Sequence, residues 1–361
     1  MSTRVLLLCG GMSGEHEVSL ASARSVLEAA RDLNVVPLVI GRDGALLSSG
    51  ESRALLGLPP ADSTESPVGQ LGELAESGEA DGPADLPAAH RGALTLARAV
   101  SEADVVFPLL HGPFGEDGRV QGMLDMLGLP YVGAGVFGSS VAMDKLGMKA
   151  VFAAHDLPQV RYVPVTRHRW RKAPAEVTEE VEGLQLPLFV KPANLGSSIG
   201  ISRVDEPAQL APALDEAFEH DRRVVVEEGV VGARELEIGV LGNDEPELSV
   251  VGEIRYGSEF YDYATKYTDG EAQLLVPADV PPQVVERLRA IAKRAFAAVD
   301  AAGMARVDFF HQPETGQVLL NEINTIPGFT RHSMYPLLWQ ASGVSYPQLI
   351  RRLVALALEQ R

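Results

Sequence analysis

The chain has 361 residues, of which 46% are hydrophobic, enough for two or three domains that each bury a core. Its formal net charge of -18 argues against nucleic acid and anionic membranes as partners. The single cysteine, Cys9, excludes a disulfide within the chain. Together with an N-terminal apolar run too short for a signal peptide or a membrane span, it predicts a protein of the reducing cytoplasm.

The N-terminal segment predicts the opening of an α/β domain. An apolar run at 4–9 ends at the glycine-rich turn 10–14, and a helical pattern begins near Val18. A second strand is expected at 35–40. The glycine spacing does not fit G-x-G-x-x-G, so an NAD-dependent oxidoreductase is disfavoured.

Residues 48–90 differ in composition from the rest of the chain. They are rich in Ser, Gly, Pro and Ala, and residues 54–90 hold seven acidic groups and no Lys or Arg. This pattern is typical of a surface insertion, and we assign it no chemistry.

The remaining elements are expected in three domains, 1–133, 134–229 and 230–361. The expected strands and helices are a strand at 103–110, a helix at 119–127, a strand at 130–132, a helix at 142–154, strands at 188–191 and 223–227, and a helix at 283–300 that ends before Gly303.

Two short apolar strands, at 303–308 and 319–325, are joined by a turn at 312–316 and predict a β-hairpin centred near residue 314 or 315. Since side chains alternate along a strand, Arg306 and Asp308 share one face, as do Glu322 and Asn324. The turn brings Asp308 roughly opposite Glu322. Oxygen donors of this kind suit Mg²⁺ bound together with substrate phosphates, although a hairpin with a solvated polar face would have the same pattern.

The loop 195–200 lies between two strand-like runs and is preceded by Lys191. Its glycines and serines allow backbone N–H groups to approach an anion, which favours phosphate binding, although it is not a Walker loop. Downstream, the apolar run 224–226 ends at Glu227 and Glu228. These carboxylates are candidates for contacts with adenine or ribose, or are simply the solvated end of a strand.

Four further features each allow a structural and a functional interpretation. The aromatic segment 260–267 is either a hairpin strand or a lid that excludes water. Glu15 either stabilises a helix N-terminus or faces a substrate ammonium. His111 is either a satisfied loop histidine or a ligand of the substrate. The N–H of Gly328 could face a reacting oxygen.

Seven motifs in order resemble those of the ATP-grasp superfamily and, within it, the D-alanine–D-alanine ligase family. They are Gly10-Gly11-x-Ser13-x-Glu15-x-Glu17-Val18-Ser19, Leu110-His111-Gly112 with Gly115-Glu116-Asp117-Gly118, Met143-Asp144-Lys145, Lys191-Pro192 with Gly196-Ser197-Ser198-x-Gly200, Tyr261-Asp262-Tyr263-x-x-Lys266-Tyr267, Arg306-x-Asp308, and Asn321-Glu322-x-Asn324-Thr325-x-Pro327-Gly328. They span residues 10–334 apart from the 48–90 insertion, and the set is far more specific than any single motif.

The resemblance implies a three-domain α/β ATP-grasp enzyme with a Rossmann-like N-terminal domain and a lid at 257–270. The implied reaction joins two D-alanine molecules through an acyl phosphate at the expense of ATP, for peptidoglycan precursor synthesis. The implied cofactors are two Mg²⁺ or Mn²⁺ and a monovalent cation such as K⁺, and a homodimer is expected.

The same resemblance implies roles for individual residues. ATP would be held by Lys145, Lys191, Lys266, Glu227, Glu228, Val230 and Glu235. The divalent ions would be held by Asp308, Glu322 and Asn324. Catalysis would involve Glu15, Ser197, Tyr267, Arg306 and Gly328, and the second substrate would meet His111, Ser333 and Met334.

Two rivals are close to this interpretation. Another ATP-grasp ligase with a different amino or hydroxy acid would share the hairpin and the lysines, but should differ at Glu15, His111 or Ser333. A nucleotide-binding regulator without catalysis would be expected to lack Arg306, Asp308 or Glu322, and the chain has all three.

Overall fold

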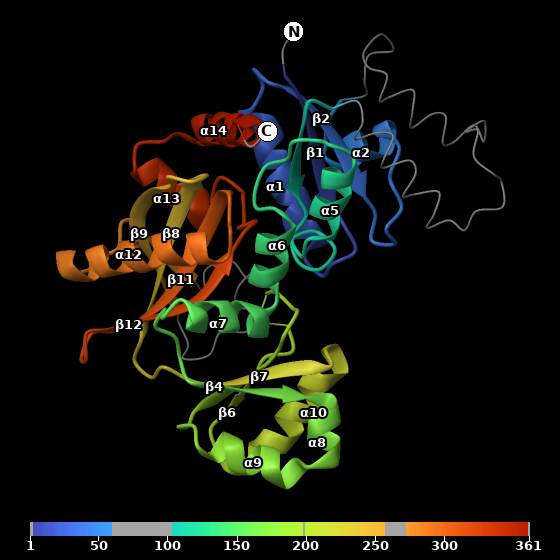
Figure 1. Cartoon of the computed structure of the whole chain (residues 1–361). Coiled ribbons are helices and arrows are strands. Elements are labelled where there is room, and N and C mark those ends of the chain that lie inside the picture. Colours follow the sequence, from blue (N-terminus) through green and yellow to red (C-terminus); the bar gives the residue numbers. More distant parts are fainter. Residues whose placement is uncertain (1–2, 60–102, 198, 257–271, 360–361) are drawn as a thin grey trace, which may run out of the picture.

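The computed structural model describes residues 3–59, 103–197, 199–256 and 272–359. The expected lid at 257–270, with Lys266 and Tyr267, lies outside the described residues, as does most of the 48–90 segment. The described chain forms three sheets with helices around them (Figure 1). None of its helices is long and apolar enough to cross a bilayer.

The first sheet is parallel, with strand order β2-β1-β3. Its elements are β1 (Arg4–Gly10), α1 (His16–Ala29), β2 (Asn34–Ile40), α2 (Ser49–Leu55), β3 (Val105–Leu109) and α5 (Arg119–Met126). The predicted order of strand, glycine turn and helix is confirmed, and Cys9 is fully buried in β1. The prediction of a strand at 130–132 is wrong, because this segment makes only an isolated β-bridge between Tyr131 and Val106.

The start of the 48–90 segment differs from the predicted surface insertion, because helix α2 packs against the first sheet. Ser48 caps the helix: its Oγ accepts from the Glu51 N–H, and the Glu51 carboxylate accepts from the Ser48 N–H. Ser52 is fully buried, and its Oγ accepts from the Val39 N–H at 3.2 Å. The helix is therefore anchored to β2 and is not a surface insertion.

The second sheet is antiparallel, with order β4-β7-β5-β6. Its strands are β4 (Tyr162–Thr166), β5 (Leu188–Pro192), β6 (Ser202–Val204) and β7 (Arg223–Glu228). Its helices are α8 (Arg167–Lys172), α9 (Pro174–Glu182), a 3₁₀ turn (Pro207–Gln209) and α10 (Leu210–His220). Together they form the lower lobe in Figure 1, with its own core around Val190, Leu214 and Val226.

The third sheet is antiparallel, with order β10-β9-β8-β11-β12. Its strands are β8 (Arg234–Gly242), β9 (Glu247–Tyr256), β10 (Ala272–Leu275), β11 (Gly303–Gln312) and β12 (Gln317–Asn324). The amphipathic helix α12 (Pro282–Ala298) covers one face through Leu288 and Ile291, which pack with Ile238 and Val307. Helix α13 (Met334–Ala341) lies on the other face, where Gly239 and Gly252 leave room for it.

The helix predicted at 142–154 is instead two helices, α6 (Val136–Met143) and α7 (Lys145–Ala154). Asp144 separates them with an extended backbone, and its carboxylate accepts the N–H groups of Leu146 and Gly147 at 3.1 and 2.9 Å. The sequence pattern hides this break, because Asp144 ends one helix and caps the next.

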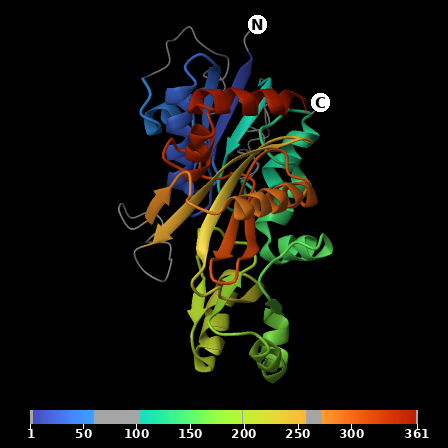
Figure 2. The same ribbon diagram turned by 90° about the vertical axis from the view of Figure 1, so that its left-hand side faces the viewer.

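The C-terminal helix α14 (Tyr346–Glu359) returns to the first sheet. Its Leu349 and Leu353 are fully buried in the same core as Leu7 of β1. In Figures 1 and 2 this helix lies beside α1, near the N-terminus. The division of the chain into domains at 133 and 229 stays a prediction.

Candidate active site

The β11–β12 hairpin pairs Asp308 directly with Glu322 and Arg306 with Asn324, which confirms the predicted register. Arg306 donates to both oxygens of Asp308, at 2.8 Å from Nε and 2.6 Å from Nη2. Its Nε also lies 3.1 Å from Glu237 Oε2 on β8. Burial disfavours the charge of Arg306, but Asp308 and Glu237 outweigh it and raise its pKa.

These residues offer a divalent cation only part of a coordination shell. Asp308 and Glu322 are hard oxygen donors on one face, which is what Mg²⁺ prefers. Asn324 Nδ2 lies 3.0 Å from Asp308 Oδ2 and 3.4 Å from Glu322 Oε1, so its amide would have to turn over to present Oδ1. Among the residues that the structure describes, no three His, Cys, Asp or Glu side chains form a metal-binding group. The donor set therefore fits an ion whose coordination shell is completed by phosphate oxygens.

Three charged side chains meet behind this hairpin in a buried cluster. Glu227 on β7 forms ion pairs with Lys191 of β5 through Oε1 and with Lys149 of α7 through Oε2, the latter at 2.8 Å. Burial raises the pKa of the Glu227 carboxyl, but the two lysines dominate and lower it to about 2. Burial works against the charged form of Lys191, yet Glu227, Glu322 and Glu235 raise its pKa. Lys191 thus lies within electrostatic reach of Glu322 on the hairpin.

Glu227 and Glu228 point to opposite faces of β7, as neighbours on a strand must. The Glu228 carboxylate accepts from Arg161 at 2.9 Å and from the Gln185 N–H at 3.0 Å, away from the lysines. Val230 lies in the turn that follows β7, where its carbonyl accepts from the Ala233 N–H. The structure therefore brings Glu227 and Glu235 toward Lys191, and places the Glu228 side chain elsewhere.

The loop after β5 is tied to helix α7 through Lys145. Its Nζ donates to the Leu195 carbonyl at 2.5 Å, and its backbone N–H donates to the Ala193 carbonyl. Ser197 in this loop has a φ of +51°, a left-handed conformation that is uncommon for a serine. Its Oγ donates to Glu15 Oε1, which connects the loop to the N-terminus of α1.

Glu15 lies in a space kept open by two glycines. A Cβ on Gly112 would come within 2.8 Å of Glu15 Oε2, and one on Gly196 within 2.9 Å. Gly112 also has a φ of +76°, which disfavours any side chain. As the N-cap residue of α1, Glu15 makes no side-chain capping hydrogen bond. Its carboxylate therefore faces the loops and not the helix backbone.

His111 is a satisfied buried histidine in this structure. Its Nδ1 lies 3.0 Å from the Ile326 carbonyl oxygen, and its Nε2 lies 3.4 Å from Ser22 Oγ. Burial lowers its pKa, although Glu15 and the Ile326 carbonyl oppose the shift. Ser22 Oγ also accepts from the Phe329 N–H, so His111 helps to hold the loop that carries Gly328.

Ser333 and Met334 lie where that loop enters α13. Ser333 Oγ accepts from the Thr330 N–H at 3.1 Å and lies 3.2 Å from the position of a Cβ on Gly328. Met334 is buried, and its sulfur lies 2.7 Å from the position of a Cβ on Gly252. Gly328 and Ser333 are therefore neighbours, as a shared substrate site requires.

Sequence reasoning missed Lys149 and Glu116. Lys149 is one helical turn after Lys145, so the i, i+4 spacing could have placed both on one face of α7. Glu116 Oε1 accepts from the Gly112 N–H at 2.9 Å. Burial and repulsion by Glu15 raise the Glu116 pKa to about 8, which no local pattern indicates.

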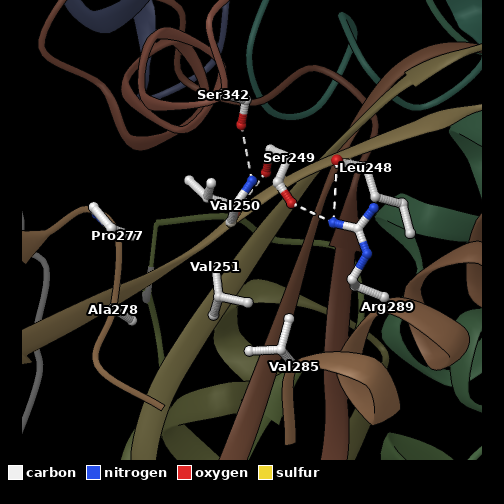
Figure 3. A pocket seen from close by; sticks show the side chains of 9 residues that line it. All are labelled: Leu248, Ser249, Val250, Val251, Pro277, Ala278, Val285, Arg289 and Ser342. Atoms are coloured by element: carbon white, nitrogen blue, oxygen red, sulfur yellow. Dashed lines mark hydrogen bonds between the residues drawn. The ribbon is translucent and has the colours of Figure 1, made fainter. Parts of the chain in front are cut away.

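A cavity of about 410 Å³ lies outside this region (Figure 3). It is lined by residues of β9, α12 and the segments around Pro277 and Ser342, and it contains none of the predicted site residues. Arg289 in this cavity donates hydrogen bonds to the carbonyl oxygens of Leu248 and Ser249, at 3.2 and 2.8 Å.

Comparison with known proteins connects this arrangement to one group of enzymes. Residues 4–134 match the family model described as the D-ala D-ala ligase N-terminus, and residues 151–355 match the D-ala D-ala ligase C-terminus. A D-alanine--D-alanine ligase of Deinococcus radiodurans is 50% identical over 364 residues, covering all of both chains. One of Geobacillus thermodenitrificans is 48% identical over 363 residues, covering all of this chain and 96% of the relative.

Solved structures agree with these relatives. The D-alanine-D-alanine ligase from Coxiella burnetii has a TM-score of 0.76 at 34% identity, covering 99% of this chain and 94% of that one. The VanG D-Ala:D-Ser ligase from Enterococcus faecalis has a TM-score of 0.79 at 31% identity, covering 99% of this chain and 100% of that one.

Proposed function

Because the chain belongs to the D-alanine–D-alanine ligase family, we propose that it joins two D-alanine molecules into D-alanyl-D-alanine at the expense of ATP, with release of ADP and phosphate. The product would serve peptidoglycan precursor synthesis in the cytoplasm. The observation that carries the proposal is the pairing of Asp308 with Glu322 on the hairpin, together with the electrostatic interaction of Glu322 with Lys191, which is ion-paired to the buried Glu227. This juxtaposition of acids and cations suits a metal-bound polyphosphate.

In the first step, a carboxylate oxygen of one D-alanine attacks the γ-phosphorus of ATP. An O–P bond forms, the bond between the γ-phosphorus and the bridging oxygen breaks, and ADP leaves with that oxygen. Lys145, Lys191 and Lys266 hold the phosphates and offset their charge. Asp308, Glu322 and Asn324 would hold two Mg²⁺ or Mn²⁺ ions, which would supply further charge neutralisation.

In the second step, the amine of the other D-alanine attacks the acyl phosphate carbon. A C–N bond forms, the bond between the carbonyl carbon and the phosphate oxygen breaks, and inorganic phosphate leaves while the proton of the attacking amine passes to the phosphate or to solvent. Arg306 and the Gly328 N–H stabilise the oxyanion of the tetrahedral intermediate, and losing one such donor typically costs about 10²–10³ in rate. Arg306 suits this role because it keeps its charge in a buried setting.

Substrate positioning falls to two groups of residues. Glu15 binds the ammonium of the first D-alanine, and Ser197 and Tyr267 hold Glu15 in place; the Ser197–Glu15 hydrogen bond supports this arrangement. Ser333 and Met334 contact the second D-alanine. His111 supports the site by holding the loop that carries Gly328, as its two hydrogen bonds suggest.

Adenine and ribose would be bound at the end of β7 and the start of β8. Glu227, Glu228, Val230 and Glu235 are the proposed contacts. Glu228 would contact the nucleotide through its backbone, because its carboxylate is hydrogen-bonded to Arg161. The lid at 257–270 would exclude water from the acyl phosphate. The domain limits 1–133, 134–229 and 230–361 and a K⁺ requirement are further parts of the proposal.

We also propose a homodimer that forms through α5 and α6. These helices pack on each other, since a Cβ on Gly122 would lie 3.7 Å from Val136 Cγ2. Their outer surface exposes Met126 (90%), Phe137 (54%) and Val136 (40%). Neighbouring exposed apolar side chains of this size are typical of protein contacts.

The proposal is tested by measuring phosphate release from MgATP with D-alanine, L-alanine, D-lactate or D-serine, and by identifying the product. We expect release that requires D-alanine and yields the D,D-dipeptide. D-Serine is included because one structural neighbour is a D-Ala:D-Ser ligase. MgATP binding without turnover on D-alanine would keep the fold assignment and contradict the proposed substrate.

A further inference from the structure

Lys149 is a buried lysine to which the proposed reaction assigns no role. It lies on α7, one turn after Lys145, and its side chain is 3% exposed. Its ammonium lies 2.8 Å from Glu227 Oε2 and 5.1 Å from the centre of the Tyr162 ring. A lysine is seldom buried to this degree unless it is paired, so the contact with Glu227 calls for an explanation.

Glu227 lies between two lysines that come from different elements. On the sheet, Glu227 of β7 is directly opposite Tyr162 of β4 and Phe189 of β5. Lys149 lies over the first ring, and Lys191 lies 5.8 Å from the centre of the second. Each lysine pairs with a different oxygen of the carboxylate. Glu227 therefore has two positively charged partners, and it keeps one of them if the other leaves.

The charge balance matters when a polyphosphate arrives. If Lys191 is to bind phosphate, it must leave or weaken its ion pair with Glu227. A buried carboxylate that loses its partner is strongly destabilised, which would oppose the transfer. Lys149 is on the other oxygen and is more deeply buried than Lys191, at 3% against 14% exposed. It can therefore stay with Glu227 while the more accessible Lys191 moves.

We propose that Lys149 is a positioning residue that acts as the resident counter-ion of Glu227, so that Lys191 can be transferred to the phosphates of the nucleotide. This inference rests on the proposed binding of ATP phosphates by Lys191. It assigns to Lys149 no contact with the nucleotide itself. Its effect on ATP binding passes through Glu227 and Lys191.

The test compares MgATP with adenosine, because only the former has phosphates. Dissociation constants for both are measured by calorimetry on wild type, Lys149→Met, Lys149→Arg, Glu227→Gln and the double variant Lys149→Met/Glu227→Gln. Lys293→Met, in an exposed position on α12, controls for the loss of one positive charge. Circular dichroism and thermal melting establish that each variant is folded.

In Lys149→Met, we expect MgATP to bind about tenfold more weakly or worse, with adenosine within about twofold of wild type, because Lys191 is now the only partner of Glu227. Lys149→Arg should restore most of the loss, and Lys293→Met should show none. Adding Glu227→Gln should recover the preference for MgATP over adenosine, because the carboxylate that retains Lys191 is gone. Steady-state assays should show the same split, with KM for ATP raised and KM for D-alanine little changed.

Equal weakening of MgATP and adenosine in Lys149→Met, or no recovery in the double variant, would overturn the inference and leave a structural role. If Lys149→Met does not fold, Lys149→Gln takes its place with the same expected results. Equal weakening of MgATP and adenosine in that variant would overturn the inference. A wild-type protein that does not bind MgATP would instead contradict the proposed function, and with it the basis of this inference.

Discussion

Ser197 donates a hydrogen bond to the carboxylate of Glu15 from 182 residues away in the sequence. Glu15 precedes α1 of the first sheet, and Ser197 follows β5 of the second. Ser197 reaches this position with a φ of +51°. A strained backbone at a contact between two sheets is typical of a functional site.

Two substitutions of Ser197 separate the hydroxyl from the backbone strain. We expect Ser197→Ala and Ser197→Gly each to lower kcat/KM for D-alanine by about 10- to 100-fold, because both lose a hydrogen bond to a charged group. Ser197→Gly should also raise the free energy of unfolding by about 1 kcal/mol relative to Ser197→Ala, since glycine accepts the left-handed conformation. The measurements are steady-state kinetics and urea unfolding. Wild-type activity in either variant would remove the proposed role of the hydroxyl.

Glu322→Gln tests the metal assignment while keeping the size of the side chain. We expect a folded protein whose turnover falls by about 10²-fold or more, because the charge opposite Asp308 is lost. Turnover is measured as a function of Mg²⁺ concentration, and thermal melting reports on folding. Glu314→Gln is the matched control, since Glu314 lies exposed in the turn of the same hairpin. Near-normal turnover of Glu322→Gln at saturating Mg²⁺ would refute the assignment.

Glu116 should make the stability depend on pH. Burial and the charge of Glu15 raise its pKa from 4.5 to about 8, so the folded protein keeps this carboxyl protonated where the unfolded chain ionises it. Its stabilising contribution is therefore complete below pH 4.5 and is lost as the pH rises to about 8. Glu116→Gln removes this dependence.

We expect Glu116→Gln to gain stability over wild type between pH 5 and pH 8, by on the order of 1–3 kcal/mol, which allows for partial solvent access. Above this range the difference should level off. Urea unfolding at pH 5, 6.5, 8 and 9 measures it. Parallel curves for the two proteins would show that Glu116 titrates normally.

Phe137→Glu tests the proposed dimer. The substitution places a charge among the exposed apolar side chains of α5 and α6, so we expect the wild type to be a dimer and the variant a monomer. Light scattering after size-exclusion chromatography gives the molar mass. Leu358→Glu is the control, since Leu358 is a partly exposed leucine on α14. A monomeric wild type would contradict the proposed dimer. A dimer that Phe137→Glu leaves intact would place the interface on another surface.

The sequence alone determined the elements whose register is set locally. The β11–β12 hairpin is the best example, because a short turn fixes which residues face each other and so pairs Asp308 with Glu322. The strand, glycine turn and helix at the N-terminus follow from an apolar run and the periodicity after it. The helix expected at 283–300, which is α12 in the structure, follows from the same kind of periodicity.

Only the tertiary structure decided which charges that are distant in the sequence become neighbours. Lys149, Lys191 and Glu227 come from three elements, and no local period relates them. The contact between Ser197 and Glu15 and the return of α14 to the first sheet are equally distant in sequence. Local propensity and alternation act over a few residues, whereas burial and Coulomb energy depend on separation in space. Partners and shifted pKa values, such as those of Glu116 and Glu227, therefore appear only when the sheets come together.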